Sequence, residues 1–438
     1  MSELKRVLII TYYWPPSGGA GVQRWLKFAK YLPEHGWQPV IYTPSNPEFP
    51  SEDPSLLADV PAEAEVIRQP IREPYDYYRK VVGAGKGEKI NTGFLTESER
   101  PKRTENLSRW VRGNLFIPDA RKWWIKPSIA FLKQYISEHP VDAIVSTGPP
   151  HSMHRIALGV KRATGLPWVA DFRDPWTQID FYHDLHLTRY ADRKHHRQER
   201  EVLEGADVVT GAWPSMQTLF YQHAAPKQVE VITNGYDPAD VPTEAPALDA
   251  QFTLAHVGSF SPARNPKALW QALQELKSSR PELGEALRIK LAGKVDVSVR
   301  KDIAAHGLES HLDVHDYIPH AEIGAFQASS RMLLLVANKA PTAKWIIPGK
   351  VFEYFSAKRP ILAVCPPDGD LAAMVRDAGA GTVVGFDDVP GTKKAVLEAF
   401  LAFQSGQTPP PTHGLERYSR VALTARLSGV LTAVCGRI

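Results

Sequence analysis

Short apolar runs alternate with helix-forming patterns along both halves of this 438-residue chain. Runs of this length suit buried strands, and apolar residues spaced three and four apart suit helices that cover a sheet. The alternation therefore predicts an α/β fold in which mostly parallel sheets carry helices on both faces. Because the chain exceeds a single usual hydrophobic core, we expect two such domains.

The expected elements form two series. In the first half we expect strands at 7–11, 39–42, 143–146, 167–171, 208–210 and 229–233, with helices at 22–34, 125–137, 152–164 and 189–204. In the second half the expected strands are 252–257, 288–292, 312–315, 332–336, 361–364 and 382–384. Residues 72–120 show no clean strand, which predicts an insertion with a polar part around 83–103.

The expected domains are separated by a proline-containing linker at 237–250. We expect an N-terminal domain over residues 1–240 and a C-terminal domain over 251–415. Residues 416–438 form a final segment with a helix at about 417–434.

Composition narrows the class of protein. Hydrophobic residues make up 43% and charged residues 23%, which is ordinary for a globular protein. The 52 basic and 48 acidic residues leave a net charge of +4, too small to suggest nucleic acid. Two cysteines, Cys365 and Cys435, provide no disulfide framework and no metal-ligand spacing. No apolar stretch has the length of a signal or a membrane span, so we expect a cytoplasmic protein.

A glycine-rich turn follows the first expected strand. The strand at 7–11 leads into a segment that contains Gly18 and Gly19, and a helical pattern follows. This order places glycines where a ligand can approach the backbone. The glycine spacing differs from G-x-G-x-x-G, so this is not the dinucleotide-binding fingerprint.

A second helix start lies near the end of the chain. Pro348 and Gly349 open a short helix, and Lys350 and Glu353 share one of its faces. A helix N-terminus suits a diphosphate, and a carboxylate one turn later suits the hydroxyls of a ribose. The alternative is an ordinary helix–strand unit with a solvated Lys/Glu pair.

The order and spacing of four motifs resemble the GT-B glycosyltransferases, specifically glycosyltransferase family 4. The motifs are 15–19, 231–237, 257–267 and 350–353, and the resemblance covers nearly the whole chain. It implies two Rossmann-like, doubly wound domains that face each other across a cleft. The N-terminal domain would bind the acceptor, the C-terminal domain would bind a nucleotide sugar, and the final helix would cross back to the first domain. One departure is Trp345, which stands where the family often has a second glutamate, eight residues before Glu353.

The resemblance also assigns residues to the donor. Those implied to bind it are Gly18, Gly19, Gly258, Arg264, Lys267, Lys350 and Glu353. Arg264 and Lys267 match the Arg/Lys pair that the family places beside the leaving diphosphate. Cations at the carboxyl end of a strand would stabilise the charge that develops there in the transition state. The alternative is a pair of solvated charges in the first turn of a helix.

Two further loops at strand ends carry candidate residues. The family often has a histidine near the donor sugar at the position of His151 and His154. We favour His154 as the catalytic one because it lies in the first helical turn, and we keep His151 for the acceptor. A surface histidine is the alternative.

The segment 171–176 is a dense polar cluster. Asp171 is a candidate base or acceptor-orienting group, Arg173 and Asp174 are candidates for acceptor binding, and Trp176 for stacking on a sugar. A structural Asp–Arg pair that fixes the loop is the alternative. The two aspartates flank an arginine rather than forming D-x-D, so we expect no bound metal.

Together these features predict a retaining transferase. It would move a hexose from a nucleotide diphosphate sugar, UDP first and GDP as the alternative, to a hydroxyl acceptor in surface polysaccharide or glycolipid assembly. The family needs no metal or other cofactor, and the leaving phosphate acts as the base. The rival functions are a nucleotide-sugar epimerase of the same fold and a non-catalytic sugar-binding assembly protein.

Basic stretches at 121–126 and 189–200 suggest a partner for the first domain. Their residues could bind a lipid-phosphate acceptor or the anionic inner face of a membrane. The residues concerned are Lys122, Trp123, Trp124, Lys126, Arg193, Lys194 and Arg197. The alternative is a solvated helix next to buried tryptophans.

Overall fold

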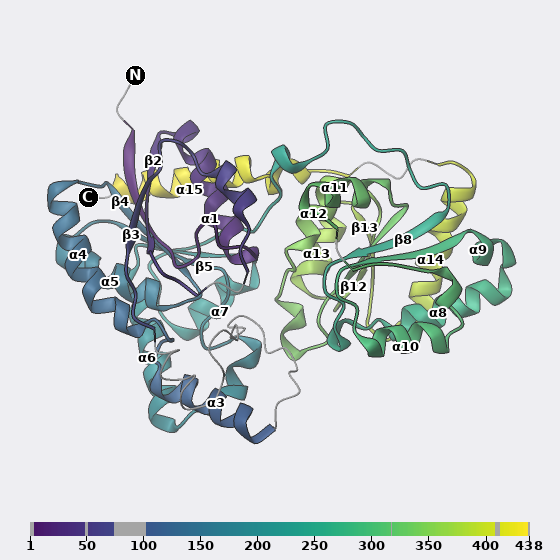
Figure 1. The fold of residues 1–438 in the computed structure, drawn as a ribbon, viewed down its shortest axis with the longest axis horizontal. Coiled ribbons are helices and arrows are strands. Elements are labelled where there is room, and N and C mark those ends of the chain that lie inside the picture. The colour runs from purple at the N-terminus through teal and green to yellow at the C-terminus, as the bar shows by residue number, and fades with distance from the viewer. Residues whose placement is uncertain (1–3, 49–50, 74–101, 317, 408–411, 437–438) are drawn as a thin grey trace. The chain divides into compact units, whose positions relative to one another are not determined.

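The structure is a computed structural model that describes residues 4–48, 51–73, 102–316, 318–407 and 412–436 (Figure 1). Its contacts divide the chain into two compact units. The first unit is Met1–Thr233 with Arg420–Ile438, and the second unit is Asn234–Ser419. Each unit contains one parallel sheet with helices packed on it (Figure 1).

The sheet of the first unit has seven parallel strands in the order β3-β2-β1-β4-β5-β6-β7. Their bounds are β1 Lys5–Ile10, β2 Trp37–Pro44, β3 Glu65–Gln69, β4 Ala143–Gly148, β5 Trp168–Phe172, β6 Val208–Gly211 and β7 Val229–Val231. Six of them lie on the expected apolar runs. Strand β3 was not predicted, because its side chains are only partly buried at the sheet edge and form no apolar run.

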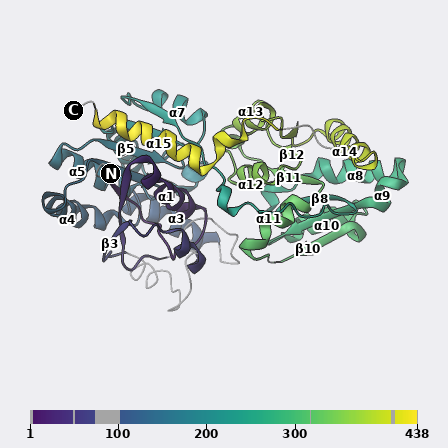
Figure 2. The ribbon, with the colours of Figure 1, turned by 90° about the horizontal axis from the view of Figure 1, so that it is seen from above.

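Helices cover both faces of this sheet. The helices of this unit are α1 Ala20–Tyr31, α3 Lys102–Leu115, α4 Ile125–Glu138, α5 Ser152–Thr164, α6 Arg189–Gly205, α7 Ser215–His223 and α15 Arg420–Cys435, of which α3 packs on α6. Trp25 and Leu26 of α1 pack with Leu427 of α15 and with alternate residues of β1, β4 and β5. Figure 2 shows α15 running beside α1. Helices α4 and α5 cover the other face (Figure 1). Of the expected insertion, residues 74–101 lie outside the described residues.

The second unit has a six-stranded parallel sheet in the order β10-β9-β8-β11-β12-β13. Its strands are β8 Phe252–Val257, β9 Leu287–Ala292, β10 Leu312–His315, β11 Met332–Val336, β12 Ile361–Val364 and β13 Gly381–Val384. Its helices are α8 Lys267–Ser279, α9 Pro281–Ala286, α10 Val297–Ala305, α11 His320–Ser329, α12 Lys350–Ala357, α13 Asp370–Asp377 and α14 Val389–Gln404. One core joins α8, α10 and α14 to the alternate apolar residues of five of these strands.

Short 3-10 turns connect many of these elements. They are η1 Leu32–His35, η2 Pro54–Asp59, η3 Lys122–Trp124, η4 Asp180–Leu185, η5 Pro238–Asp240, η6 Pro262–Arg264, η7 Glu309–His311, η8 Pro341–Lys344 and η9 Leu415–Tyr418. None of the helices in the described part of the chain is long and apolar enough to span a membrane.

In each sheet the strand order reverses direction at one point, between β1 and β4 in the first unit and between β8 and β11 in the second. This order is that of the doubly wound Rossmann fold, so the predicted fold class is confirmed for both sheets. In such sheets ligands bind outside the carboxyl ends of the strands at the reversal point. The loops that follow β1, β4, β8 and β11 are therefore the places to look for function.

Candidate functional site

In the second unit, Gly258 follows β8 and passes directly over the side chain of Lys350. Its φ of 117° lies in the region that favours glycine, and an added Cβ would overlap the Lys350 Nζ. The next loop is equally close, since a Cβ on Gly293 would lie 2.9 Å from the Gly258 carbonyl oxygen. The backbone of Gly258 therefore contacts the ammonium group of Lys350 at the point where the strand order of this sheet reverses.

Arg264 brings a second cation to the same loop. Its Nε donates to Asn338 Oδ1 at 2.7 Å, and Asn338 follows β11. Burial lowers the pKa of Lys350, the charge of Glu353 raises it, and the charge of Arg264 lowers it again. Burial also lowers the pKa of the Arg264 guanidinium. Two partly desolvated cations that repel each other across a glycine loop favour an anion bound beside them.

Lys267 lies apart from this arrangement. It is the first residue of α8, its side chain is 74% exposed, and its Nζ lies 3.7 Å from Asp302 Oδ2. This placement matches the alternative of a solvated charge in a first helical turn. The cation that joins Arg264 in the structure is Lys350.

Glu353 lies one turn after Lys350 and its side chain is exposed. Its Oε2 accepts a hydrogen bond from Gln327 Nε2 at 3.2 Å. An oriented carboxylate that is open to solvent can still accept hydroxyl hydrogens from a ligand. Trp345 follows η8 and is 36% exposed.

In the first unit, Asp171 is the penultimate residue of β5, and its carboxylate is enclosed. Arg24 Nη2 donates to it at 2.7 Å, and the other donors are Arg24 Nε, Trp25 Nε1, Thr147 Oγ1 and Thr210 Oγ1. Burial alone would raise the pKa of this carboxyl, but the charge of Arg24 and these hydrogen bonds lower it to about 2. A carboxylate saturated with donors is a poor base. The geometry favours the structural Asp–Arg pair, with Arg24 rather than Arg173 as the partner.

Arg24 was not among the predicted site residues. It is 1% exposed, and it also donates to the carbonyl oxygens of Ile232 and Thr233, which follow β7. The pair therefore joins α1, the end of β5 and the segment after β7. The signal in the sequence was a charged residue beside the apolar positions Val22, Trp25 and Leu26 of a helix that covers a sheet.

His154 and His151 are both buried, so the alternative of a surface histidine is wrong. His154 Nδ1 lies 2.8 Å from Ser146 Oγ, and its ring stacks on Phe172 at 4.3 Å. Burial lowers the pKa of His154 to about 3, although the charge of Asp171 acts in the opposite direction. Burial also holds the pKa of His151 well below its usual value. Both imidazoles are therefore neutral at ordinary pH.

One nitrogen of each histidine has no hydrogen-bond partner among the described residues. These atoms are His154 Nε2 and His151 Nδ1. Both face Gly148, since a Cβ added there would lie 2.5 Å from His154 Nε2 and 3.1 Å from His151 Nδ1. Buried polar atoms are nearly always paired, so unpaired atoms beside a glycine loop indicate a place for a ligand or water.

Arg173 connects the loops that follow β1, β4 and β5. Its Nη2 donates to the Pro149 carbonyl oxygen, and a Cβ added at Gly21 would lie 2.6 Å from its Nη1. Its guanidinium carbon lies 5.7 Å from the ring centroid of Tyr13. Burial lowers the pKa of Arg173, and the charge of the adjacent Asp174 raises it. Arg173 is therefore a cation at the reversal point of the first sheet.

Trp176 is only 3% exposed and stacks on His151 with ring centroids 4.5 Å apart. Its Nε1 donates to His195 Nδ1 at 3.1 Å. A ring enclosed in this way supports the loop that carries His151. We had predicted that Trp176 stacks on a sugar, but in this arrangement the ring face that contacts His151 is not available to one.

The glycines after β1 have separate reasons to be glycine. A Cβ on Gly18 would lie 2.8 Å from Ser51 Oγ, and Gly19, the N-cap of α1, has a φ of 92° with nothing around its added Cβ. Of the described side chains that could together hold a metal ion, one group lies elsewhere in this unit and was not predicted: His196, Glu199 and His223.

Comparison with known proteins gives the fold. No family model and no curated protein sequence matches the chain. Sucrose-phosphate synthase from Thermosynechococcus elongatus is similar in structure with a TM-score of 0.59 and 14% identity, covering 99% of this chain and 100% of that one. HepE of Anabaena, solved in complex with UDP and glucose, has a TM-score of 0.53 and 15% identity over 98% of this chain and 100% of that one.

A third similar structure is a Listeria monocytogenes protein named for UDP-N-acetylglucosamine 2-epimerase activity. Its TM-score is 0.54 at 9% identity, and the match covers 99% of this chain and 98% of that one. At such identities the likeness concerns the fold, and it confirms the predicted GT-B fold with two Rossmann-like domains.

Proposed function

We propose that this protein is a glycosyltransferase that moves a hexose from a nucleotide diphosphate sugar to a hydroxyl acceptor with retention of configuration. The observation that carries the proposal is the pair of cations, Arg264 and Lys350, beside the Gly258 loop. Two cations can bind the negative charges of a diphosphate. The pair lies where the strand order of the second sheet reverses, which is where this fold binds ligands. The likeness to HepE, solved with UDP and glucose, makes UDP the first nucleotide to test and GDP the second.

In the proposed reaction the acceptor oxygen bonds to the anomeric carbon as the bond from that carbon to the diphosphate oxygen breaks. The acceptor proton passes to the leaving phosphate oxygen, so the proposed step uses no carboxylate base or nucleophile. Negative charge grows on the diphosphate in the transition state. Arg264 is oriented by Asn338, and Lys350 is partly desolvated, so both cations are prepared for that charge.

The acceptor would bind to the first unit, beside Arg173 and the loop that carries His151 and His154. The two unpaired imidazole nitrogens suit hydroxyl groups, because a neutral imidazole nitrogen can accept or donate a hydrogen bond. Arg173 suits an anionic group. We propose a glycan or lipid-linked acceptor of surface polysaccharide or glycolipid assembly.

Glu353→Ala is expected to weaken nucleotide binding by about 1.5–3 kcal/mol, because hydrogen bonds to a charged group are lost. Glu353→Gln should lose less, since its carbonyl oxygen can still accept one hydroxyl. Calorimetry with UDP and GDP measures the change. Glu398→Ala, an exposed carboxylate of α14, is the matched control. Unchanged binding of both nucleotides to Glu353→Ala would remove the ribose contact from the proposal.

The second candidate is a nucleotide-sugar epimerase, which the likeness to the Listeria monocytogenes protein favours. Thermal-shift screening with UDP-, GDP- and dTDP-sugars identifies the nucleotide, since a ligand at 100 times its Kd adds roughly 2.7 kcal/mol. The selected sugar nucleotide is then incubated without an acceptor. Conversion to an epimer would support the epimerase, whereas turnover only with an added acceptor supports the transferase.

Basic and aromatic side chains lie together on the surface of the first unit. Lys122 Nζ is 5.1 Å from the ring centroid of Phe116, and Lys194 Nζ is 5.9 Å from that of Tyr190. Burial lowers the pKa of Lys122, and so does the charge of Lys194. Trp123 is 46% exposed and Tyr190 71%. We use the name basic–aromatic surface for Phe116, Lys122, Trp123, Tyr190 and Lys194. We propose that this surface binds an anionic membrane.

Trp124 does not belong to this surface. It is 2% exposed and stacks on Tyr42 with ring centroids 4.9 Å apart. Of the two tryptophans considered as an apolar anchor, only Trp123 is available.

Vesicles with anionic lipid should sediment the protein at low salt and release most of it at roughly 0.5 M salt, where the Debye length is only a few ångströms. Each charge near the surface contributes about 1 kcal/mol. Trp123→Ala should remove the part of the binding that salt leaves intact. Trp345→Ala, an exposed tryptophan of the second unit, is the control. Equally poor binding to anionic and neutral vesicles would remove the support for a lipid-linked acceptor, and the class of the acceptor would then be unknown.

A further inference from the structure

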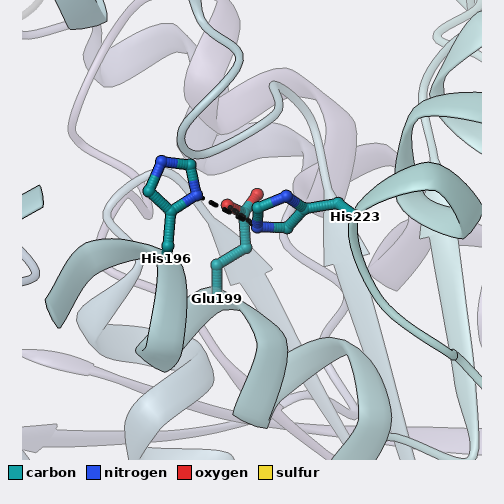
Figure 3. Close-up of side chains that lie close together, drawn as sticks. All are labelled: His196, Glu199 and His223. Atoms are coloured by element: carbon teal, nitrogen blue, oxygen red, sulfur yellow. Dashed lines mark hydrogen bonds and ion pairs between the residues drawn. The ribbon is translucent and has the colours of Figure 1, made fainter. Parts of the chain in front are cut away.

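Three side chains of metal-binding type meet between α6 and α7, apart from the sites described above. His196 and Glu199 are three residues apart on α6, and His223 is the last residue of α7. Figure 3 shows the two imidazoles and the carboxylate pointing toward one another. The proposed transfer reaction uses none of them.

The distances between their ligand atoms suit one metal ion. His196 Nδ1 lies 3.4 Å from His223 Nε2, which lies 3.1 Å from Glu199 Oε2. A tetrahedral zinc ion bound at 2.0–2.2 Å separates its ligands by about 3.3–3.6 Å. An ion therefore fits between these three atoms with only small side-chain adjustments.

Neighbouring groups hold the ligands as they do around known metal centres. His196 Nε2 faces Asp192 Oδ1 at 3.4 Å, and Tyr182 donates to the same oxygen at 2.9 Å. Metal-bound histidines usually direct their second nitrogen to a carboxylate in this way. Thr177 Oγ1 donates to Glu199 Oε2 at 2.5 Å. The unused nitrogen of His196 and the carboxylate of Glu199 are thus already oriented.

Burial and access also suit a bound ion. The Glu199 side chain is fully buried, while those of His196 and His223 are 37% and 16% exposed, which leaves a route from solvent. A buried carboxylate benefits from a nearby cation. Two imidazoles and one carboxylate are a donor set for zinc and related transition metals, whereas calcium and magnesium prefer oxygen ligands.

We propose that His196, Glu199 and His223 bind a divalent transition-metal ion, with zinc as the ion to test first. A water molecule would complete a tetrahedral set, while Thr177 Oγ1 keeps its hydrogen bond to Glu199 Oε2. The ion would join α6, α7 and the loop that contains Trp176, the ring on which His151 stacks. It would stabilise the first unit and has no part in the transfer step.

The test uses the full-length protein after removal of metals with a chelator. Titration with Zn²⁺ against a chromophoric competitor should give one tightly bound ion per chain. Co²⁺ should give the intense visible bands of a tetrahedral site. His196→Ala and His223→Ala should each lower the affinity by about 100-fold, and Asp192→Asn by about 10-fold, the range measured for outer partners of metal ligands.

His183→Ala is the matched control, since this exposed histidine lies nearby on η4 and should leave zinc affinity unchanged. Zinc binding that survives the combined His196→Ala and His223→Ala substitutions would overturn the proposal. If those variants fail to fold, the Zn²⁺ stoichiometry and the Co²⁺ spectrum of the native protein test the proposal. Absence of one-equivalent binding, or an octahedral Co²⁺ spectrum, would show that the three side chains form only a hydrogen-bonded cluster.

Discussion

Asp171→Ala is expected to lower the free energy of unfolding by about 3–5 kcal/mol, because it leaves the buried Arg24 without its counter-charge. Both side chains are 1% exposed, and the Arg24 Nη2 to Asp171 Oδ1 distance is 2.7 Å. The loss also removes hydrogen bonds from Trp25, Thr147 and Thr210. Denaturant unfolding of the ligand-free protein, monitored in the first unit, measures the effect.

Two further variants make this result specific. Asp171→Asn keeps the shape but removes the charge, so it should lie between Ala and the native residue. Asp313→Ala, an exposed carboxylate beside His315, should change stability by no more than about 0.5 kcal/mol. If Asp171→Ala were as stable as the native protein yet inactive, Asp171 would be a base rather than a structural anchor.

The same pair predicts how stability depends on acid. The pKa of Asp171 is about 2 in the folded protein, compared with about 3.9 for an unperturbed aspartate. A carboxyl whose pKa is depressed by folding stabilises the fold fully above its unfolded value. This contribution should fall as the pH drops from about 4 toward 2, and it should be absent in Asp171→Asn.

Arg264→Ala and Lys350→Ala are each expected to lower kcat by a factor of about 10² or more, because the charge that they meet develops in the transition state. Arg264→Ala also loses the hydrogen bonds to Asn338 and Ser259, each of which is worth about 1 kcal/mol of unfolding free energy. Steady-state kinetics with the sugar nucleotide identified by thermal shift measures both kcat and KM. Lys277→Ala, on α8 with its Nζ on the Gly307 carbonyl oxygen, is the control.

Lys267→Ala distinguishes the two possible cation pairs. If the pair is Arg264 with Lys350, as the geometry favours, Lys267→Ala should lose much less activity than Lys350→Ala. A loss as large as that of Arg264→Ala would restore Lys267 to the diphosphate. A rise in KM with unchanged kcat for Arg264→Ala and Lys350→Ala would show that these cations bind the donor without assisting bond breaking.

Most strands could be predicted from the sequence because parallel strands are buried on both faces and form continuous apolar runs. Strands β8, β11 and β12 are buried along their whole length and have the predicted bounds for this reason. Strand β3 lies at a sheet edge, and its side chains are partly exposed. Its sequence therefore contains no continuous apolar run, and it was not predicted. The helix start at Lys350 was visible because proline and glycine precede it.

The candidate sites could be predicted only to the level of their loops. A glycine turn or a cluster such as 171–176 shows that a strand has ended, and the end of a parallel strand is where ligands bind. Which side chains meet there depends on strand order and on helix rotation. His151 and His154, three residues apart in the sequence, were therefore identified as candidates, but their burial against Trp176 and Phe172 was not.

The sequence by itself determined the alternation of strands and helices, the two-domain organisation and the loops at the strand ends, since these depend on local patterns of apolar residues, glycine and proline. Only the tertiary structure decided which charges pair. Arg24 and Asp171 are 147 residues apart, and they meet because α1 packs over the end of β5. Lys350 reaches Gly258, and Lys267 turns toward Asp302, because packing of the helices on the sheet sets the direction of each side chain. Long-range electrostatic partners of this kind leave no periodic trace in a single sequence.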